Sequence, residues 1–210
     1  MKDFWDNKFR EVKSSWGMEP SDSAILAKDF FLEHHIFDIL IPGVGYGRNA
    51  NIFLQCGIKV TGIEISEYAI SMAKEIFKLD FPIYHGSVTG MPFDNKRYDG
   101  IFCYALIHLL NKPERKQFIQ ACFDQLKPNG YMIFTFVSKK SGMYENGRFL
   151  SENRYEIGKG LNVFFYDLES GRNEFINFGL FDIQEIDEPI KHMDNEPPLK
   201  CIMVKCKRNK

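Results

Sequence analysis

The stretch from Ile36 to Gly47 reads Ile-Phe-Asp-Ile-Leu-Ile-Pro-Gly-Val-Gly-Tyr-Gly, and it decides the fold. Its first half is an apolar run that ends at Pro42, which predicts a buried strand. Its second half places three glycines directly before a predicted helix over residues 48–56. Glycine allows the backbone to approach a ligand closely, and the N-terminus of a helix carries partial positive charge. The stretch predicts a strand–loop–helix unit that binds a ligand, although a tight turn without a ligand could use the same glycines.

Strands and helices alternate downstream of this unit. We expect strands over residues 58–63, 82–85, 100–105 and 131–137, and helices over 67–79 and from Pro113 to just before Pro128. Such alternation predicts a doubly wound α/β fold, a parallel sheet with helices on both faces. The last third differs: residues 138–165 form a polar, glycine-containing excursion, followed by a helix over 168–178. Strands over 181–185 and 201–207 have no helical pattern between them, so we expect an antiparallel pair at the sheet edge.

Upstream, residues 1–20 show apolar residues at helical spacing, and residues 22–35 predict a second helix. We find no repeat and no linker, so all 210 residues are expected to form one domain. The N-terminal residues do not resemble a signal peptide, and no apolar run reaches the roughly 20 residues of a membrane span. The sequence therefore predicts a soluble, cytoplasmic protein with no membrane partner.

The formal net charge is −1 and the sequence pI is about 6.5, which disfavours a nucleic-acid partner. The basic cluster Lys205, Lys207, Arg208 and Lys210 is interpreted as a solvated tail. The five cysteines include no C-x-x-C pair and are expected to be reduced thiols, with Cys103 packed in the core.

Glu64 follows the second strand, about twenty residues after the glycines. An acid at this place can accept hydrogen bonds from both hydroxyls of a ribose. The alternative is a surface glutamate beside Ser66, which we expect to cap the next helix. The glycine loop favours the ribose-binding interpretation.

Two cofactor classes fit a glycine loop followed by an acid. A dinucleotide site requires Gly or Ala at the sixth position of G-x-G-x-x-G, where this chain has Arg48. A nicotinamide-dependent oxidoreductase is therefore the weaker alternative. A non-catalytic cofactor-binding module is a further rival.

Four segments in order carry a resemblance: PGVGYG, VTGIEIS, GSVTGMPFDNKRYDGIFCYALIHLL and LKPNGYMIFTF. In this succession the chain resembles a class I S-adenosylmethionine-dependent methyltransferase from about Trp5 to Lys205. The resemblance implies a Rossmann-like sheet of seven strands, mostly parallel with a C-terminal antiparallel hairpin. It also implies S-adenosylmethionine as the cofactor.

The resemblance assigns cofactor contacts residue by residue. The methionine portion would lie beside Gly43, Val44, Gly45 and Tyr46. The ribose would bind Glu64, and the adenine would lie against Ile65, Ser87 and Val88. Tyr104 would lie near the methionine amine or the transferred methyl group. Two positions depart from the family pattern: Ile41 replaces a frequent acid, and Ser87 replaces a frequent Asp.

The Pro-Gly-x-Gly loop and the N-terminal segment are similar to the branch of thiopurine, thiol/halide and tellurite-resistance methyltransferases. This similarity implies that residues 1–35 form a helical cover over the cofactor. It also implies a small-molecule substrate, with a thiol or another soft nucleophile as one acceptor class.

Methyl transfer requires alignment of the two reactants, and a hydroxyl or amine acceptor would also benefit from a general base. His108 is the best candidate base, and a packed core histidine is the alternative. His34 and His35 are expected to be solvent-exposed, and no metal is expected because adjacent helical residues diverge and no third ligand is evident.

The substrate pocket is expected between the N-terminal cover and residues 138–165. Its conspicuous side chains are Trp16, Tyr144, Arg148 and Arg154. Core packing of the tryptophan and plain surface charge on the arginines are the alternatives. No motif specifies the acceptor atom or the oligomeric state.

Overall fold

A computed structural model of the chain describes residues 2–12, 17, 19–158, 160–190 and 196–209. Its main sheet has seven strands in the order β3-β2-β1-β4-β5-β10-β9. The strands are β1 (Asp38–Pro42), β2 (Lys59–Glu64), β3 (Ile83–His85), β4 (Tyr98–Tyr104), β5 (Leu126–Val137), β9 (Leu180–Glu188) and β10 (Leu199–Lys207). Strands β1 to β5 pair in parallel, whereas β10 is antiparallel to both β5 and β9. The predicted doubly wound sheet with a C-terminal antiparallel hairpin is confirmed.

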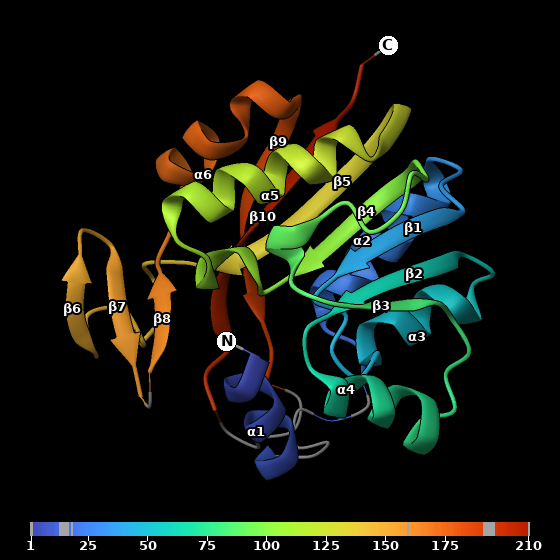
Figure 1. Cartoon of the computed structure of the whole chain (residues 1–210). Coiled ribbons are helices and arrows are strands. Elements are labelled where there is room, and N and C mark those ends of the chain that lie inside the picture. The colour runs from blue at the N-terminus through green and yellow to red at the C-terminus, as the bar shows by residue number, and fades with distance from the viewer. Residues whose placement is uncertain (1, 13–16, 18, 159, 191–195, 210) are drawn as a thin grey trace.

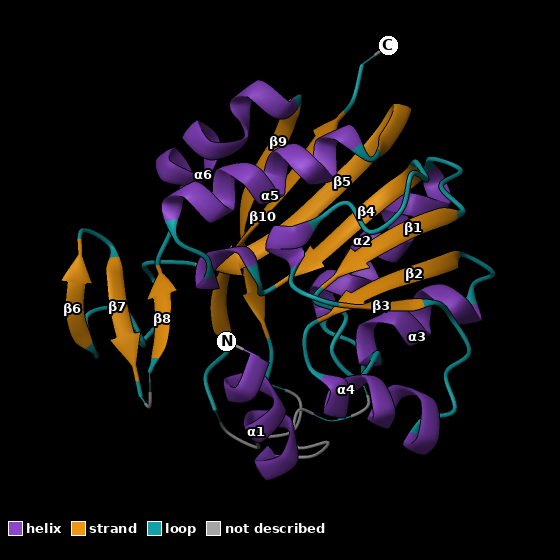
Figure 2. Ribbon diagram, viewed as in Figure 1, coloured by secondary structure: helices purple, strands orange, loops and turns teal. Residues whose placement is uncertain are grey.

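Helices cover both faces of this sheet (Figure 2). They are α1 (Lys2–Val12), α2 (Asp22–Glu33), α3 (Arg48–Gln55), α4 (Glu67–Ser71), α5 (Lys112–Asp124) and α6 (Leu168–Phe175). Four short turns complete them: η1 (Met72–Ile76), η2 (Val88–Gly90), η3 (Ile107–Leu109) and η4 (Ile176–Phe178). The helix predicted over 67–79 is thus α4 followed by η1, a turn of π-helix.

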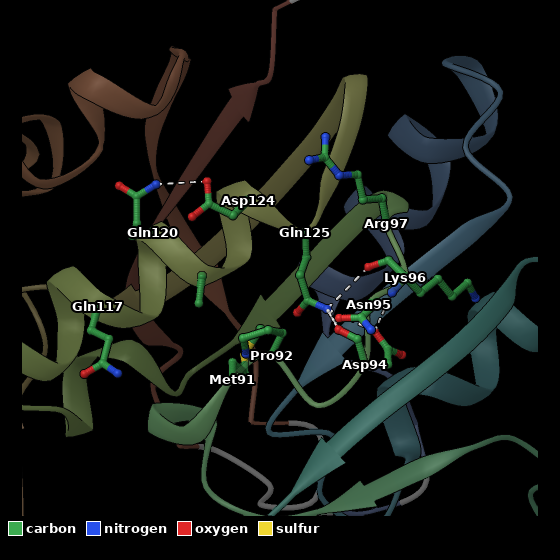
Figure 3. Close-up of a pocket in the computed structure, with 11 residues that line it drawn as sticks. Met91, Pro92, Asp94, Asn95, Lys96, Arg97, Gln117, Gln120, Asp124 and Gln125 are labelled. Atoms are coloured by element: carbon green, nitrogen blue, oxygen red, sulfur yellow. Dashed lines mark hydrogen bonds between the residues drawn. The ribbon is translucent and has the colours of Figure 1, made fainter.

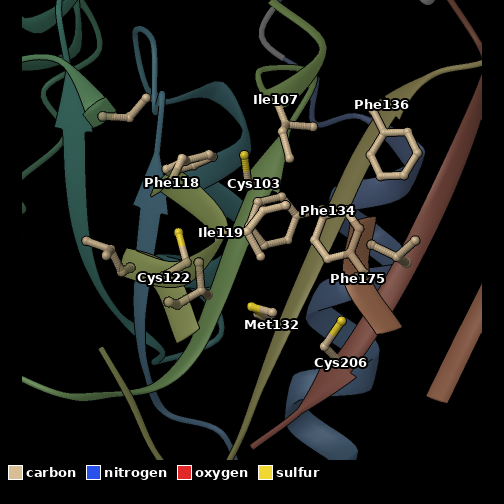
Figure 4. Close-up of a cluster of buried hydrophobic side chains, with 14 of the residues drawn as sticks. Cys103, Ile107, Phe118, Ile119, Cys122, Met132, Phe134, Phe136, Phe175 and Cys206 are labelled. Carbon is tan, nitrogen blue, oxygen red and sulfur yellow. The ribbon is translucent and has the colours of Figure 1, made fainter. Parts of the chain in front are cut away.

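Helices α5 and α6 pack on one face of the sheet (Figure 4). Phe118 of α5, Phe134 of β5 and Phe175 of α6 meet there and are fully buried. Cys103 is buried in the same cluster, as predicted. Because side chains alternate along a strand, neighbouring positions of β4 and β5 face opposite cores.

The other face is covered by α2 and α3. Ala24, Ala27 and Phe31 of α2 pack with Phe53 of α3 against β1, β4 and β5. The second half of residues 1–35 therefore belongs to the core of the fold. The first half, helix α1, lies beyond the carboxyl ends of the parallel strands (Figure 1).

Residues 138–165 contain a separate sheet that the composition of this segment did not predict. Its three antiparallel strands are β6 (Arg148–Ser151), β7 (Arg154–Ile157) and β8 (Leu161–Phe164). It stands to one side of the main sheet (Figure 1).

The interpretation of the basic C-terminal cluster as a solvated tail is wrong for Lys205, Lys207 and Arg208, and Lys210 lies outside the described residues. Lys205 and Lys207 belong to β10, where each pairs with β5. Arg208 donates hydrogen bonds to the carbonyl oxygens of Phe123 and Asp124, at distances of 2.8 and 3.0 Å. Its positive charge thus complements the C-terminal end of α5.

Among the described residues, no helix combines the length and apolar character that a membrane span needs.

Candidate functional site

A cavity of about 530 Å³ lies at the carboxyl ends of the parallel strands, under helix α1. Ligands of open α/β sheets bind at this edge, where the loops leave the strands. The volume falls within the range of about 300–1,000 Å³ that is usual for small-molecule sites. The cavity extends from residues after β3, across β2, β1 and β4, to the ends of β9 and β10.

The loop after β1 forms the centre of the cavity wall. Gly43, Gly45 and Gly47 all have left-handed backbone angles, with φ of 68°, 58° and 85°. A Cβ atom on Gly43 would collide with the side chain of Leu106. Glycine is therefore required at position 43 by conformation and by space, and the loop backbone lies open to the cavity.

Glu64 ends β2 and is 5% exposed. One of its carboxylate oxygens accepts a hydrogen bond from the Gly45 N–H at 2.8 Å, and the other accepts from the Ser66 N–H at 2.9 Å. A carboxylate offers about four acceptor positions, so capacity remains for hydroxyl groups in the cavity. Burial raises the pKa of Glu64, and the backbone hydrogen bonds oppose this shift without reversing it.

Ser66 caps α4, as predicted, with its side chain accepting a hydrogen bond from the Ala69 N–H. Ile65, Ser87 and Val88 line the same end of the cavity as Glu64. The Ser87 hydroxyl lies 2.8 Å from that of Thr89 and caps the short turn η2. Ile65, Ser87 and Val88, which the resemblance grouped around the adenine, thus lie together in the cavity lining.

Helix α1 closes the cavity through contacts that the sequence did not reveal. Trp5 and Phe9 line the cavity, and the Phe9 ring meets the Tyr46 ring edge-on at 6.1 Å. Asp6 accepts hydrogen bonds from the Ser66 hydroxyl at 2.6 Å and from the Tyr68 N–H at 3.1 Å. Although burial opposes them, these bonds keep the pKa of Asp6 below its usual value.

Tyr104, at the end of β4, also lines the cavity, as expected. The Arg48 guanidinium lies 5.7 Å from the centre of its ring. Burial raises the pKa of the Tyr104 phenol, so this group stays protonated at neutral pH. Tyr104 can therefore form a hydrogen bond to a ligand but does not act as a resting base.

His108 does not line the cavity. Its side chain is buried below the turn η3, and burial lowers the pKa of the imidazole to about 3. Among the described residues its Nδ1 atom has no hydrogen-bond partner. This placement corresponds to the packed alternative, and the catalytic role of His108 remains a prediction without a geometric basis.

The predicted substrate residues of the 138–165 segment also lie outside the cavity lining. Tyr144 packs on the rings of Tyr155 and Phe165, and Arg148 forms an ion pair with Glu156. Arg154 donates a hydrogen bond of 2.7 Å to the carbonyl oxygen of Leu110. Trp16 lies outside the described residues. Among these residues Arg154 has an indirect connection to the cavity, because its hydrogen bond supports the loop that contains the lining residue Leu110.

Side chains that sequence reasoning missed form the far end of the cavity. They come from the loop after β4 and from the ends of β9 and β10: Leu106, Leu109, Leu110, Glu114, Glu188, Pro189, Ile190 and Leu199. Residues 106–110 belong to one of the segments that carry the family resemblance, so the sequence did offer a reason to consider them as site residues. Nothing in the local sequence marked Glu188.

Among the described residues, no three His, Cys, Asp or Glu side chains are grouped as a metal site. His34, expected to be exposed, instead stacks on Phe30 with 4.0 Å between ring centres.

A second cleft of about 420 Å³ lies between α5 and the loop before β4 (Figure 3). Asp94 holds this loop together by accepting hydrogen bonds from Tyr84, Tyr98, Gln125 and the Lys96 N–H. Burial raises the pKa of Tyr98, which keeps its hydroxyl a donor to Asp94. Asp94, the first aspartate of the PFDNKRYDG segment, is therefore a structural residue.

A family profile described as "Methyltransferase domain" matches residues 39–130. The tRNA N(3)-methylcytidine methyltransferase Mettl2 of Drosophila melanogaster is 24% identical over 200 residues, covering 86% of this chain and 60% of that protein. A ubiquinone biosynthesis O-methyltransferase of Alkalilimnicola ehrlichii is 26% identical over 110 residues, covering 50% of this chain and 44% of that protein. The chain thus spans less than two thirds of the length of either relative.

The structure of an S-adenosylmethionine-dependent methyltransferase from Clostridium acetobutylicum superposes with a TM-score of 0.69 at 14% identity, covering 97% of this chain and 99% of that one. The fold is therefore that of S-adenosylmethionine-dependent methyltransferases, and residues 39–130 are similar to a methyltransferase domain.

The cavity suits this cofactor. The open backbone at Gly43 and Gly45, the acceptor capacity of Glu64 and the apolar surfaces of Ile65 and Val88 match an amino acid, a ribose and an adenine in turn. When bound, S-adenosylmethionine supplies an activated methyl group on a positively charged sulfur.

Proposed function

We propose that this protein transfers a methyl group from S-adenosylmethionine to a small molecule. The observation that carries the proposal is the cavity itself, in which the glycine loop and Glu64 share one wall and a largely apolar region lies beyond Tyr104. Exclusion of water and alignment of the reactants are the main requirements of this reaction.

The cavity lining bears on the acceptor. His108 lies outside it, the Tyr104 phenol is protonated, and the other ionisable groups of the described lining are Tyr46, three glutamates and Arg48. Glu188 and Glu114 accept hydrogen bonds from backbone N–H groups, which occupy acceptor positions of both carboxylates. The proposed acceptor is therefore one that reaches its nucleophilic form without a protein base, such as a thiol, another soft nucleophile or a neutral nitrogen.

The cover formed by α1 supports the thiopurine, thiol/halide and tellurite-resistance branch as the proposed subfamily. A small-molecule acceptor agrees with the volume of the cavity, about 530 Å³, and the formal net charge of −1 gives no support to a nucleic-acid partner. The rival of a non-catalytic binding module predicts cofactor binding without turnover of any acceptor.

Calorimetric titration with S-adenosylhomocysteine tests the cofactor site. We expect micromolar binding to the wild type and a loss of at least about tenfold in Glu64→Ala, because about 1.4 kcal/mol of hydroxyl binding is removed. Glu33→Ala, at an exposed position on α2, serves as the control and should bind normally.

Since Glu64 also holds the glycine loop, Glu64→Gln is titrated in parallel, and thermal unfolding verifies that each variant is folded. Absence of binding to the wild type up to about millimolar ligand, about 4 kcal/mol of affinity, would refute the proposed function.

A further inference from the structure

The far end of the cavity carries charge as well as apolar surface. The sheet order puts the glycine loop, Glu64 and Ser87 on the β1-β2-β3 side, where the cofactor is assigned. The opposite side, formed by residues after β4 and at the ends of β9 and β10, is then left for the acceptor. Its apolar wall consists of Leu106, Leu109, Leu110, Pro189, Ile190 and Leu199.

Glu188 is the buried charge of this acceptor side. It is 3% exposed, at the carboxyl end of β9, and lines the cavity. Its carboxylate accepts hydrogen bonds from the Asp22 N–H at 2.7 Å, from the Ser23 N–H at 3.1 Å and from the Ser23 hydroxyl. These donors lie at the N-terminus of α2 and hold the carboxylate in place.

Glu114, in the first turn of α5, adds a further carboxylate to the cavity lining, where it accepts a hydrogen bond of 2.7 Å from the Asn111 N–H. Across the whole described lining there are three carboxylates, on Glu64, Glu114 and Glu188, and one guanidinium, on Arg48. Negative charge is therefore in excess, and low-dielectric walls strengthen its field within the cavity.

Tyr104 reports this field at the middle of the cavity. After burial, the charge of Glu188 is the next cause that raises the pKa of the Tyr104 phenol, and the opposing effect of Arg48 does not reverse the shift. The Tyr104 phenol thus lies within the fields of both Glu188 and Arg48.

We infer that the methyl acceptor is an uncharged, weakly basic nitrogen on an apolar, aromatic or heteroaromatic body. This inference rests on the proposed function. The nitrogen lone pair forms the new N–CH₃ bond while the S–CH₃ bond breaks and sulfur keeps the bonding electrons. Positive charge passes from sulfur to nitrogen, and the methylated cation loses any proton to solvent after release.

The charge distribution discriminates between acceptors. Glu188 and Glu114 stabilise the cation that forms on nitrogen, because fixed charges aimed at developing charge lower the barrier. An anionic acceptor, such as a thiolate, would enter against the same negative field. A strongly basic amine would arrive protonated and would meet no free base in the described lining.

Binding of a charged cofactor analogue tests the field without knowledge of the acceptor. In sinefungin a CH–NH₃⁺ group replaces the S–CH₃ group of the cofactor, so a protonated amine stands at the methyl position, whereas S-adenosylhomocysteine carries no charge there. In calorimetric titrations we expect sinefungin to bind the wild type at least about tenfold more tightly than S-adenosylhomocysteine. Glu188→Gln should reduce this preference to less than about threefold, with S-adenosylhomocysteine affinity unchanged within about twofold.

Glu114→Gln is the second variant, in case loss of the Glu188 charge disturbs the start of α2, and it should reduce the preference in the same direction. Failure of S-adenosylhomocysteine to bind the wild type contradicts the proposed function. Normal S-adenosylhomocysteine binding with no preference for sinefungin overturns the nitrogen-acceptor inference alone.

A matched pair of aromatic acceptors provides the turnover test. Benzimidazole offers a neutral nitrogen, and benzenethiol offers a thiolate on a body of similar character. Faster methylation of benzimidazole, measured as S-adenosylhomocysteine release, supports the inference. Faster methylation of benzenethiol overturns it and favours the thiol branch.

Discussion

Glu64 does two things in this structure. It joins the glycine loop to the start of α4 through hydrogen bonds from Gly45 and Ser66, and it presents its remaining lone pairs to the cavity. An acid at the end of the second strand is predictable from sequence as a ribose contact. Its contribution to the shape of the loop is visible only in the structure, because the Gly45 N–H belongs to a loop 19 residues earlier.

The raised pKa of Glu64 predicts a pH dependence of cofactor binding. Ribose hydroxyls donate to the charged carboxylate, so affinity for S-adenosylhomocysteine should fall as acidification protonates Glu64, beginning above the usual value of 4.5. Below the raised pKa the loss approaches about tenfold per pH unit. Calorimetry between about pH 8 and pH 5 measures this trend.

The free energy of unfolding of the ligand-free protein should depend on pH in the opposite direction to the affinity. A carboxyl whose folded pKa is raised contributes stability below its unfolded pKa, and this contribution is lost as pH rises through the folded value. Glu64→Gln should flatten both dependences. A wild-type affinity that is constant over this pH range would contradict the assignment of Glu64 to the ribose.

Helix α1 is attached to the domain mainly at one point, the start of α4. Asp6 accepts its two hydrogen bonds there, Lys2 pairs with Glu67 at 2.7 Å, and Arg10 lies over the Tyr68 ring. The ion pair is exposed and contributes little, whereas Asp6 is a partly buried acceptor. Asp6 therefore has the larger part in holding the cover closed.

Asp6→Ala should weaken this attachment. A hydrogen bond to a charged group is worth about 1.5–3 kcal/mol, so we expect S-adenosylhomocysteine to dissociate about tenfold faster or more. Stopped-flow measurement of the dissociation rate gives the value. Asp3→Ala alters an exposed acid of the same helix and should leave the rate unchanged. Equal rates in Asp6→Ala and the wild type would show that α1 does not retain the cofactor.

The whole domain should be stabilised by its cofactor product. A ligand at 100 times its dissociation constant adds about 2.7 kcal/mol, and a protein of this size gains roughly 2–4 °C per kcal/mol. We therefore expect saturating S-adenosylhomocysteine to raise Tm by about 5–10 °C. NADH at equal concentration should leave Tm unchanged, and a rise with NADH alone would restore the nicotinamide alternative.

Much of this architecture was predictable because the parallel strands are continuous apolar runs separated by helical segments. The three-stranded sheet was not, since β6, β7 and β8 are four residues long and expose polar side chains on one face. The apolar partners of its other face include Leu109 and Leu199, which come from distant parts of the chain. For the same reason Glu188 escaped notice: its partners, Asp22 and Ser23, precede it by about 165 residues.

The contact between Glu188 and the start of α2 has a consequence for synthesis on the ribosome. The first turn of α2 leaves the exit tunnel long before residue 188 is translated. Until Glu188 is available, the N–H groups of this turn form hydrogen bonds with water. The acceptor side of the cavity, which needs β9 and β10, is completed after the glycine loop and the Glu64 wall have formed. A nascent chain can thus assemble the proposed cofactor side of the cavity first, and the side proposed for the methyl acceptor arises only in the final stage of elongation.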